Sequence, residues 1–421
     1  MEMKAIKNSL LGEVCYEIDH PSGLKIFVIP KEGYKSTYAV FGTKYGSVDT
    51  CFRLSGEENF ITVPAGIAHF LEHKLFESEE LDAFELFSKT GASANAFTSF
   101  DSTCYLFKCS DKFEESLEIL LNFVKSPFFT QATVEKEQGI IGQEIRMYQD
   151  SPDWQLLFNL LRAVYVNNPV RIDIGGTVES IAEINADLLY SCYNTFYNLS
   201  NMALCVTGNV TPEKVLEIAD RAVKTETPVE FESCFPDEPN QPSSDYVEQK
   251  MNVGIKKFAV GFKEVCGGVP DAARRACMDV LLEIIAGKTS RLYAALLDEK
   301  LINADFGKEY FCGRGFALPM VTGESAQPEK VRDALFAEIE KLRKDGIDED
   351  SFETARRKLY GREVMGFNDI EDVANNAVKA YFYGESVFDV AEAYRSMTKE
   401  QLETLLSNAL SKETACLSVI S

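Results

Sequence analysis

Residues 65–77 read AGIAHFLEHKLFE, and at the centre of this run His69 and His73 lie four residues apart with Glu72 between them. The whole chain has only three histidines. On a helix, residues three and four apart share a face, so these three side chains point the same way. Two neutral imidazoles at this spacing can bind one zinc ion, and a neighbouring carboxylate can accept a proton. The alternative is two surface histidines on an amphipathic helix.

A catalytic zinc site normally has a third protein ligand, with water in the fourth position. His20 lies in a turn, where we expect it to be exposed, and the second half of the chain has no histidine. A carboxylate from the first half is therefore expected. Glu137 and Glu144 lie seven residues apart, two turns along one face of a helix predicted over 134–148. Periodicity leaves open which of them reaches the metal, and also leaves open that both are simply solvated.

The chemistry that these residue types permit is metal-assisted hydrolysis. Zinc lowers the pKa of a bound water to about 7. Glu72 would take the proton as the water attacks a carbonyl carbon, and could then pass it to the leaving amine.

Composition sets the class of protein. At 421 residues the chain is expected to form two or three domains. A net charge of −23 disfavours nucleic acid and anionic membranes as partners. No apolar run reaches the ~18 residues of a membrane span, and the first residues lack a signal sequence. The eleven cysteines show no paired spacing. We interpret them as reduced thiols of a cytoplasmic protein.

Strand and helix patterns alternate along both halves. Expected strands lie at 24–29, 38–42, 202–207, 258–262 and 415–420. Hairpins are expected within 91–107 and 306–322. Expected helices cover 82–90, 112–125, 134–148, 152–168, 187–197, 272–286, 290–297, 328–344, 349–364 and 398–410. The chain is therefore predicted to be α+β, with mostly antiparallel sheets flanked by helices.

The order of elements in the first half repeats in the second. The helix and strand over 184–207 resemble those over 397–419, which indicates an ancient duplication. Residues 226–246 are rich in proline, serine and acidic residues, as is typical of a linker. We predict two homologous α/β-sandwich domains in tandem, 1–225 and 247–421. The first bears the metal motif and the second lacks it.

The pattern His69-Phe-Leu-Glu72-His73 matches the H-x-x-E-H signature of inverted-motif zinc peptidases. With its flanks it resembles the family of insulinase, pitrilysin and mitochondrial processing peptidase, and in particular short two-domain bacterial members. Specific motifs carry the likeness through the first half, and element order carries it through the second. These motifs are 66–76, 91–98, 127–129, 135–137, 176–181 and 196–208.

This resemblance implies that Glu144 is the third zinc ligand, while Glu137 is a catalytic-site carboxylate that supports the ligands. It implies a zinc endopeptidase that cleaves extended polypeptides, with Glu72 as general base. Asn95 and Ala96 would lie on an edge strand to which a peptide substrate adds by main-chain hydrogen bonds.

Phe76 and Phe97 would line an apolar pocket for the substrate in such a peptidase. Packing in the core is the alternative for both phenylalanines.

The chain departs from the family at one point. Family members place an Arg and a Tyr, seven residues apart, facing the zinc. Here those positions fall on Leu297 and Ala304, and on a helix Arg291 and Tyr293 would lie on different faces. Two-domain members of the family assemble as two-chain clamshells. We therefore expect a heterodimer with a paralogous chain that supplies the Arg and Tyr, or else a homodimer. A non-catalytic assembly subunit that retains the fold is the alternative function.

Overall fold

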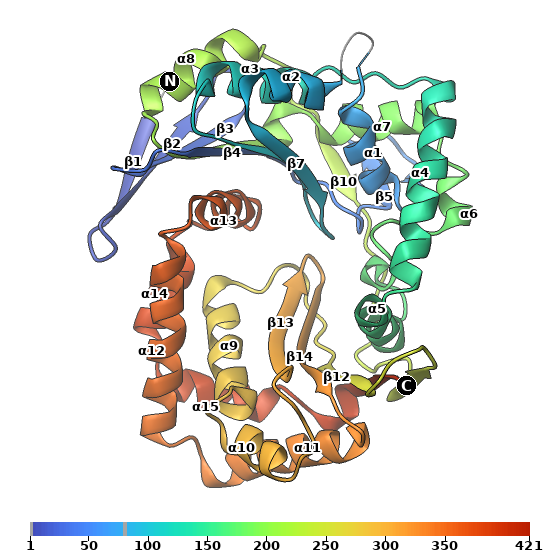
Figure 1. The fold of residues 1–421 in the computed structure, drawn as a ribbon, viewed down its shortest axis with the longest axis vertical. Helices are drawn as coiled ribbons and strands as arrows, with labels where there is room; N and C mark the ends of the chain where they lie inside the picture. The colour runs from blue at the N-terminus through green and yellow to red at the C-terminus, as the bar shows by residue number, and fades with distance from the viewer. Residues whose placement is uncertain (1–2, 79–81) are drawn as a thin grey trace. The chain divides into compact units, whose positions relative to one another are not determined.

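The computed structural model describes residues 3–78 and 82–421. The chain divides into two compact units, coloured along the chain in Figure 1. The first contains 1–145, 173–234 and 365–387, and the second contains 146–172, 235–364 and 388–421. Each unit is a sheet flanked by helices, so the predicted α+β class is confirmed.

The first unit is built on a seven-stranded sheet in the order β1-β2-β3-β9-β4-β8-β7. Strands β3 and β9 pair in parallel, and the other described neighbours pair antiparallel. The central strands β4 and β9 are buried along their whole length because helices cover both faces. The strands are β1 (Met3–Asn8), β2 (Glu13–Asp19), β3 (Lys25–Pro30), β4 (Thr37–Thr43), β7 (Ser93–Thr98), β8 (Thr103–Cys109) and β9 (Met202–Gly208).

One helix on this sheet comes from the second half of the chain. Figure 1 shows α13 on one face of the sheet and α3 and α8 on the other. Gly42 on β4 makes room for α13, since a Cβ there would lie 2.9 Å from Val378. The sequence patterns had not identified α13 or α8. The helices are α1 (Ile67–Leu75), α2 (Ala83–Thr90), α3 (Phe113–Val124), α4 (Gln131–Gln149, ending in the second unit), α6 (Val178–Ile181), α7 (Ala186–Phe196), α8 (Pro212–Ala222) and α13 (Ile370–Phe382).

A small sheet in the order β10-β5-β6 precedes the metal-motif helix. Its strands are β5 (Cys51–Leu54), β6 (Ile61–Thr62) and β10 (Phe231–Ser233), paired antiparallel. Arg53 on β5 forms an ion pair of 2.7 Å with Glu232 on β10. The first part of the predicted linker, 226–246, is thus bound to the first unit.

The second unit repeats the core topology of the first. Its sheet runs β11-β15-β12-β14-β13, with β11 and β15 parallel and the other pairs antiparallel. This order and these directions match β3-β9-β4-β8-β7, as expected for two homologous domains. The strands are β11 (Tyr246–Gln249), β12 (Lys257–Phe262), β13 (Gly307–Gly313), β14 (Phe316–Glu324) and β15 (Ala415–Ile420).

A helix from the first half of the chain packs on this second sheet. Helix α5 contacts β12 and β15, and a Cβ on Gly261 would lie 2.9 Å from Leu160 of α5. The helices of this unit are α5 (Pro152–Val164), α9 (Ala272–Ala286), α10 (Arg291–Asp298), α11 (Pro328–Asp345), α12 (Glu349–Gly366), α14 (Asp389–Ser396) and α15 (Lys399–Asn408). Short 3-10 turns lie at Pro169–Arg171, Leu199–Asn201 and Lys412–Thr414.

The compact units cut the chain differently from the linear domains proposed at 1–225 and 247–421. Segments 146–172 and 365–387 each belong to the unit built mainly from the other half. The boundary between Cys234 and Phe235 lies inside the predicted linker. The linear division stays a prediction about the repeats of the chain.

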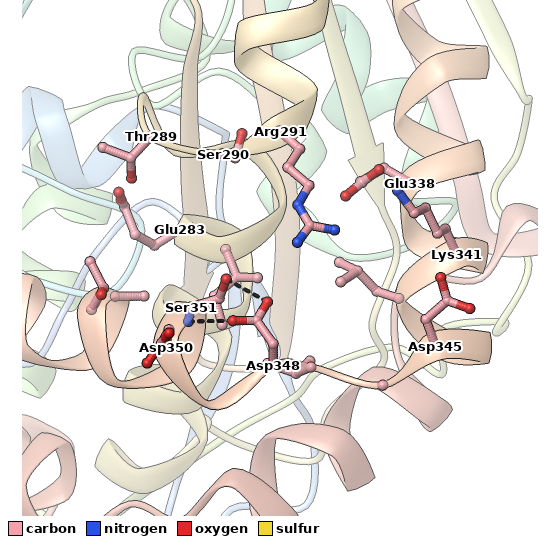
Figure 2. A pocket seen from close by; sticks show the side chains of 16 residues that line it. Glu283, Thr289, Ser290, Arg291, Glu338, Lys341, Asp345, Asp348, Asp350 and Ser351 are labelled. Atoms are coloured by element: carbon pink, nitrogen blue, oxygen red, sulfur yellow. Dashed lines mark hydrogen bonds between the residues drawn. The ribbon is translucent and has the colours of Figure 1, made fainter.

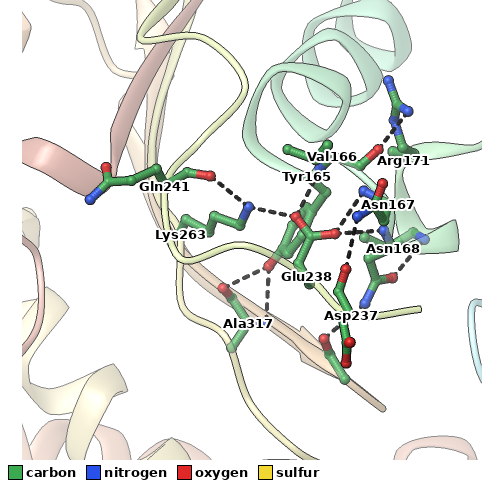
Figure 3. Close-up of polar contacts among 12 residues, drawn as sticks. Tyr165, Val166, Asn167, Asn168, Arg171, Asp237, Glu238, Gln241, Lys263 and Ala317 are labelled. Carbon is green, nitrogen blue, oxygen red and sulfur yellow. Dashed lines mark hydrogen bonds and ion pairs between the residues drawn. The ribbon is translucent and has the colours of Figure 1, made fainter. Parts of the chain in front are cut away.

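The second part of the predicted linker is anchored by Glu238, as Figure 3 shows. Its carboxylate accepts hydrogen bonds from the backbone N–H groups of Val166 (2.8 Å), Asn167 (2.7 Å) and Asn168 (2.7 Å). It also forms an ion pair of 2.5 Å with Lys263, whose side chain is 0% exposed. This stretch therefore has an ordered place in the second unit.

His20 is buried, at 7% exposure, so the expectation of an exposed turn residue is wrong. Its Nδ1 lies 2.7 Å from the Ser22 hydroxyl, and its Nε2 lies 3.0 Å from Asp220 on α8. The turn is covered because α8 packs beside β3, a contact that local sequence does not reveal.

Across the described residues, none of the helices combines the length and the apolar character needed to cross a lipid bilayer.

Candidate metal centre

Helix α1 carries the motif, and glycines fix where it begins. Gly66 has a φ of 91° and caps the helix. A Cβ on Gly66 would lie 2.4 Å from the Gly175 carbonyl oxygen, and a Cβ on Gly176 would lie 2.4 Å from the Ala65 oxygen. Only glycines allow the two backbones to approach so closely. The loop over 173–177 therefore holds the start of α1.

Two histidines and one carboxylate converge on a single point. Glu144 Oε2 on α4 lies 3.7 Å from His69 Nε2 and 3.5 Å from His73 Nε2. Ligand atoms at about 2.0–2.1 Å from a tetrahedral ion would lie about 3.4 Å apart. The observed spacing fits one such ion. Within 3–78 and 82–421, no second group of three such side chains comes together.

Glu137 contacts Nδ1 of His73, the ring nitrogen that does not face Glu144. Its Oε1 lies 2.9 Å from His73 Nδ1. An ionised carboxylate only accepts hydrogen bonds, so Nδ1 carries the proton and the Nε2 lone pair faces Glu144. Burial disfavours a charge on His73, but the Glu137 hydrogen bond and neighbouring carboxylates outweigh it and raise its pKa.

His69 is held in the neutral form. Burial, with the neighbouring His73, lowers the pKa of His69 to about 3. Its Nδ1 is buried and has no hydrogen-bond partner among the described residues. A neutral imidazole is the form that binds a metal ion, and Nε2 faces the proposed ligand Glu144.

Glu72 lies on the same helix and is 9% exposed. Its Oε2 accepts a hydrogen bond of 2.7 Å from the Thr98 hydroxyl on β7. Burial raises the pKa of Glu72, although the Thr98 hydrogen bond and His73 act in the opposite direction. Thr98 was not among the predicted site residues, although it ends the motif 91–98. A carboxylate held in this way can accept a proton close to the metal-binding side chains.

Strand β7, which carries Asn95, Ala96 and Phe97, is an edge of the described sheet. It pairs with β8, and Asn95 and Phe97 are exposed. Asn95 Oδ1 accepts a hydrogen bond of 2.9 Å from the Ala96 N–H. An added peptide strand would have to displace this contact. The predicted edge position is present, and the binding role stays a prediction.

The two candidate pocket phenylalanines differ in environment. Phe76 is buried and stacks on Phe84 (centroids 4.3 Å apart) and Phe123 (5.1 Å). Phe97 is 38% exposed on the edge strand. The placement of Phe76 favours core packing, whereas Phe97 is accessible.

The second unit supplies no Arg and Tyr at the anticipated positions. Leu297 is an exposed residue of α10, and Ala304 follows that helix. Arg291 points into a cavity of about 470 Å³ between α9, α10, α11 and α12, shown in Figure 2. Its charge contributes to lowering the pKa of Asp348, after the hydrogen bonds from Ser351. Arg291 thus faces local carboxylates of its own unit.

Comparison with protein families gives two matches that together span most of the chain. Residues 62–178 match the model described as insulinase (peptidase family M16). Residues 183–359 match the model described as the peptidase M16 inactive domain. The first match contains all the metal-motif residues.

Curated relatives are similar over the whole chain or over part of it. The uncharacterized zinc protease YmfH of Bacillus subtilis is 39% identical over 98% of this chain and 97% of its own length. The mitochondrial-processing peptidase subunit beta of Caenorhabditis elegans is 30% identical over 48% of this chain and 43% of its own. The crystal structure of an M16-like peptidase from Alicyclobacillus acidocaldarius has a TM-score of 0.92 and 33% identity, covering 100% of this chain and 98% of that one.

Proposed function

Because the chain belongs to the insulinase (M16) peptidase family, we propose that it is a zinc-dependent endopeptidase that cleaves extended polypeptides. The observation that carries the proposal is the convergence of His69, His73 and Glu144: Glu144 Oε2 lies 3.5–3.7 Å from the two Nε2 atoms, and all three ligand atoms lie within 4.8 Å of one another. The names of the zinc protease relatives support zinc as the metal. When bound there, zinc supplies a Lewis acid that polarises a carbonyl and acidifies water.

The side chains have separate roles in metal binding and in proton transfer. His69, His73 and Glu144 hold the metal, and Glu137 orients the His73 ring through Nδ1. Glu72 accepts a proton from the attacking water at a carboxylate oxygen and returns it to the nitrogen of the leaving amine. The raised pKa of Glu72, caused by burial, suits a group that must both take and give a proton.

The substrate is proposed to bind as an added strand on β7. One side of β7 pairs with no other strand of the described sheet, and such edges accept extended peptides by main-chain hydrogen bonds. Asn95, Ala96 and the exposed ring of Phe97 would then contact the peptide. Thr98 is the last residue of β7 and donates a hydrogen bond to Glu72, so the strand that would bind the peptide also holds the base.

The chain is proposed to be the metal-bearing subunit of a dimer. Leu297 and Ala304 cannot donate hydrogen bonds from their side chains to a peptide carbonyl. A paralogous chain that carries an Arg and a Tyr would supply these donors, and a homodimer is the alternative. The name of the Caenorhabditis elegans relative identifies it as one subunit of a peptidase, which supports a two-chain enzyme. The eleven free cysteines support a cytoplasmic location.

A competing function is an assembly subunit without catalysis, which the absence of the Arg and Tyr favours. A fluorogenic peptide assay with zinc analysis separates the two. We expect cleavage by the purified chain or by its complex with the co-purified partner. Glu72→Gln should abolish cleavage and retain zinc. Unchanged cleavage in Glu72→Gln would show that the base is assigned wrongly, and a zinc-free, inactive complex would favour the assembly role.

A further inference from the structure

Two cysteines face each other across the small sheet. Ser233 on β10 is opposite Phe52 on β5, so the next pair outward is Cys234 and Cys51. The backbone N–H of Cys234 donates to the Cys51 carbonyl oxygen at 2.8 Å, which extends the register to this pair. The side chains of directly opposite residues lie on the same face of a sheet. The Cys234 thiol is close enough to contribute to raising the pKa of Cys51.

This arrangement meets the geometric condition for a disulfide. Directly opposite residues in a hydrogen-bonded antiparallel pair have Cα atoms about 5.5 Å apart. Disulfide-bonded cysteines have Cα atoms about 4.4–6.8 Å apart. The Cα separation expected for this pair therefore lies within the range of disulfide-bonded cysteines.

The two thiols differ in accessibility. Cys234 is exposed and Cys51 is half-buried, whereas seven of the eleven cysteines are buried. Burial raises the pKa of the Cys51 thiol; Thr62 acts in the opposite direction, and Cys234 adds to the rise. An oxidant would therefore meet Cys234 first, and Cys51 would resolve the intermediate.

We propose that Cys51 and Cys234 form a reversible disulfide site that reacts with a low-molecular-weight disulfide. The Cys234 thiolate attacks one sulfur of the small disulfide, which releases one thiolate and leaves a mixed disulfide on Cys234. The Cys51 thiolate then attacks the Cys234 sulfur and releases the second small thiol. Two protein thiols lose two protons and two electrons, and the small disulfide takes them up as two thiols.

The bond would stiffen the segment that leads into the metal-motif helix. Cys51 also pairs with Thr62 on β6, and only 63–65 separate β6 from the cap Gly66. Without the bond, β10 is held to β5 by backbone hydrogen bonds and the exposed Arg53–Glu232 ion pair. With it, β10 cannot separate from β5.

The site can be tested on the native full-length chain with oxidised glutathione, followed by alkylation of free thiols and peptide mapping by mass spectrometry. We expect a peptide cross-linked between Cys51 and Cys234 that dithiothreitol removes. Cys51→Ser should accumulate a glutathione adduct on Cys234, and Cys234→Ser should show no cross-link. Cys266→Ser, which removes a half-buried thiol of the second unit, is the matched control and should cross-link like the wild type.

Hydrogen exchange gives the second measurement. Backbone amides of β5 and β10 should exchange more slowly in the oxidised protein than in the reduced protein, and the two Ser variants should show no difference after glutathione treatment. A stable glutathione adduct on wild-type Cys234 without cross-linking would overturn the disulfide site. Equal exchange in the two forms would overturn the stiffening of the sheet.

Discussion

Replacing Glu238 by Gln should destabilise the second unit strongly, although the two side chains have the same size. Glu238 Oε1 accepts from Val166 N and Lys263 Nζ, and Oε2 accepts from Asn167 N and Asn168 N. Gln would place an NH2 donor at one of these two positions. Whichever way the amide lies, two donors lose their acceptor, and the Lys263 charge stays buried without a counter-charge.

The magnitude follows from the burial of the pair. The side chains of Glu238 and Lys263 are 5% and 0% exposed. Removing one partner of a buried ion pair costs about 3–5 kcal/mol. For a unit of this size, each kcal/mol lowers Tm by about 2–4 °C, so the expected loss is about 6–20 °C.

The effect should depend on pH in a defined direction. Burial alone would raise the pKa of Glu238, but the hydrogen bonds from Lys263 and the three backbone N–H groups outweigh it and lower the pKa. A carboxylate with a lowered pKa stabilises the fold at pH above its unfolded value of about 4.3, and this stabilisation is lost as the pH falls through the folded value. The gap between wild type and Glu238→Gln should therefore be constant near neutral pH and shrink below about pH 4.

Urea unfolding of the full-length variants, monitored by circular dichroism, measures the loss of unfolding free energy. Calorimetry measures the loss of Tm. Glu232→Gln is the matched control, because it removes the carboxylate of an exposed ion pair with Arg53 in the same connecting segment. That variant should lose less than about 1 kcal/mol. A loss in Glu238→Gln no larger than in Glu232→Gln would refute the reasoning.

Further predictions concern the metal centre and helix α13, which comes from the second half of the chain. Glu137→Gln should weaken zinc binding by about 10–100-fold, measured by competition with a chromogenic chelator, and unchanged affinity would show that the His73 contact is not needed. Thr98→Val should lower kcat at least about tenfold, since a hydrogen bond to a charged group contributes about 1.5–3 kcal/mol, while Thr98→Ser should keep most activity; equal losses in both variants would argue against the hydroxyl contact. Zinc removal by a chelator should abolish cleavage and leave far-UV circular dichroism unchanged, because the core already holds α1 and α4; loss of helix signal would contradict this. Gly42→Ala should cost about 1–3 kcal/mol in urea unfolding, because its Cβ would lie 2.9 Å from Val378, and a neutral result would mean that α13 can move aside.

Local sequence was enough for most elements. Helix α9 and strand β15 have the bounds that their patterns predict. Asp271 is the N-cap of α9, a position that favours short side chains with a hydrogen-bond acceptor. Several elements were missed, and α13 and β10 show why: the signal is distant for one and weak for the other. Helix α13 packs on a sheet from the other half of the chain, and β10 has only three residues.

The sequence by itself determined the motif face, because the spacing of His69, Glu72 and His73 on one helix depends only on helix geometry. The division of roles between Glu137 and Glu144 could not be obtained in this way, since two turns of a helix place both on one face. The tertiary packing of α4 against α1 puts Glu137 beside His73 Nδ1 and Glu144 beside both Nε2 atoms. The same holds for Thr98 and for the Cys51–Cys234 pair, which only the pairing of distant strands and helices brings together. Local periodicity determines which residues lie on the same face of a helix. Long-range packing determines which atoms of other elements contact that face.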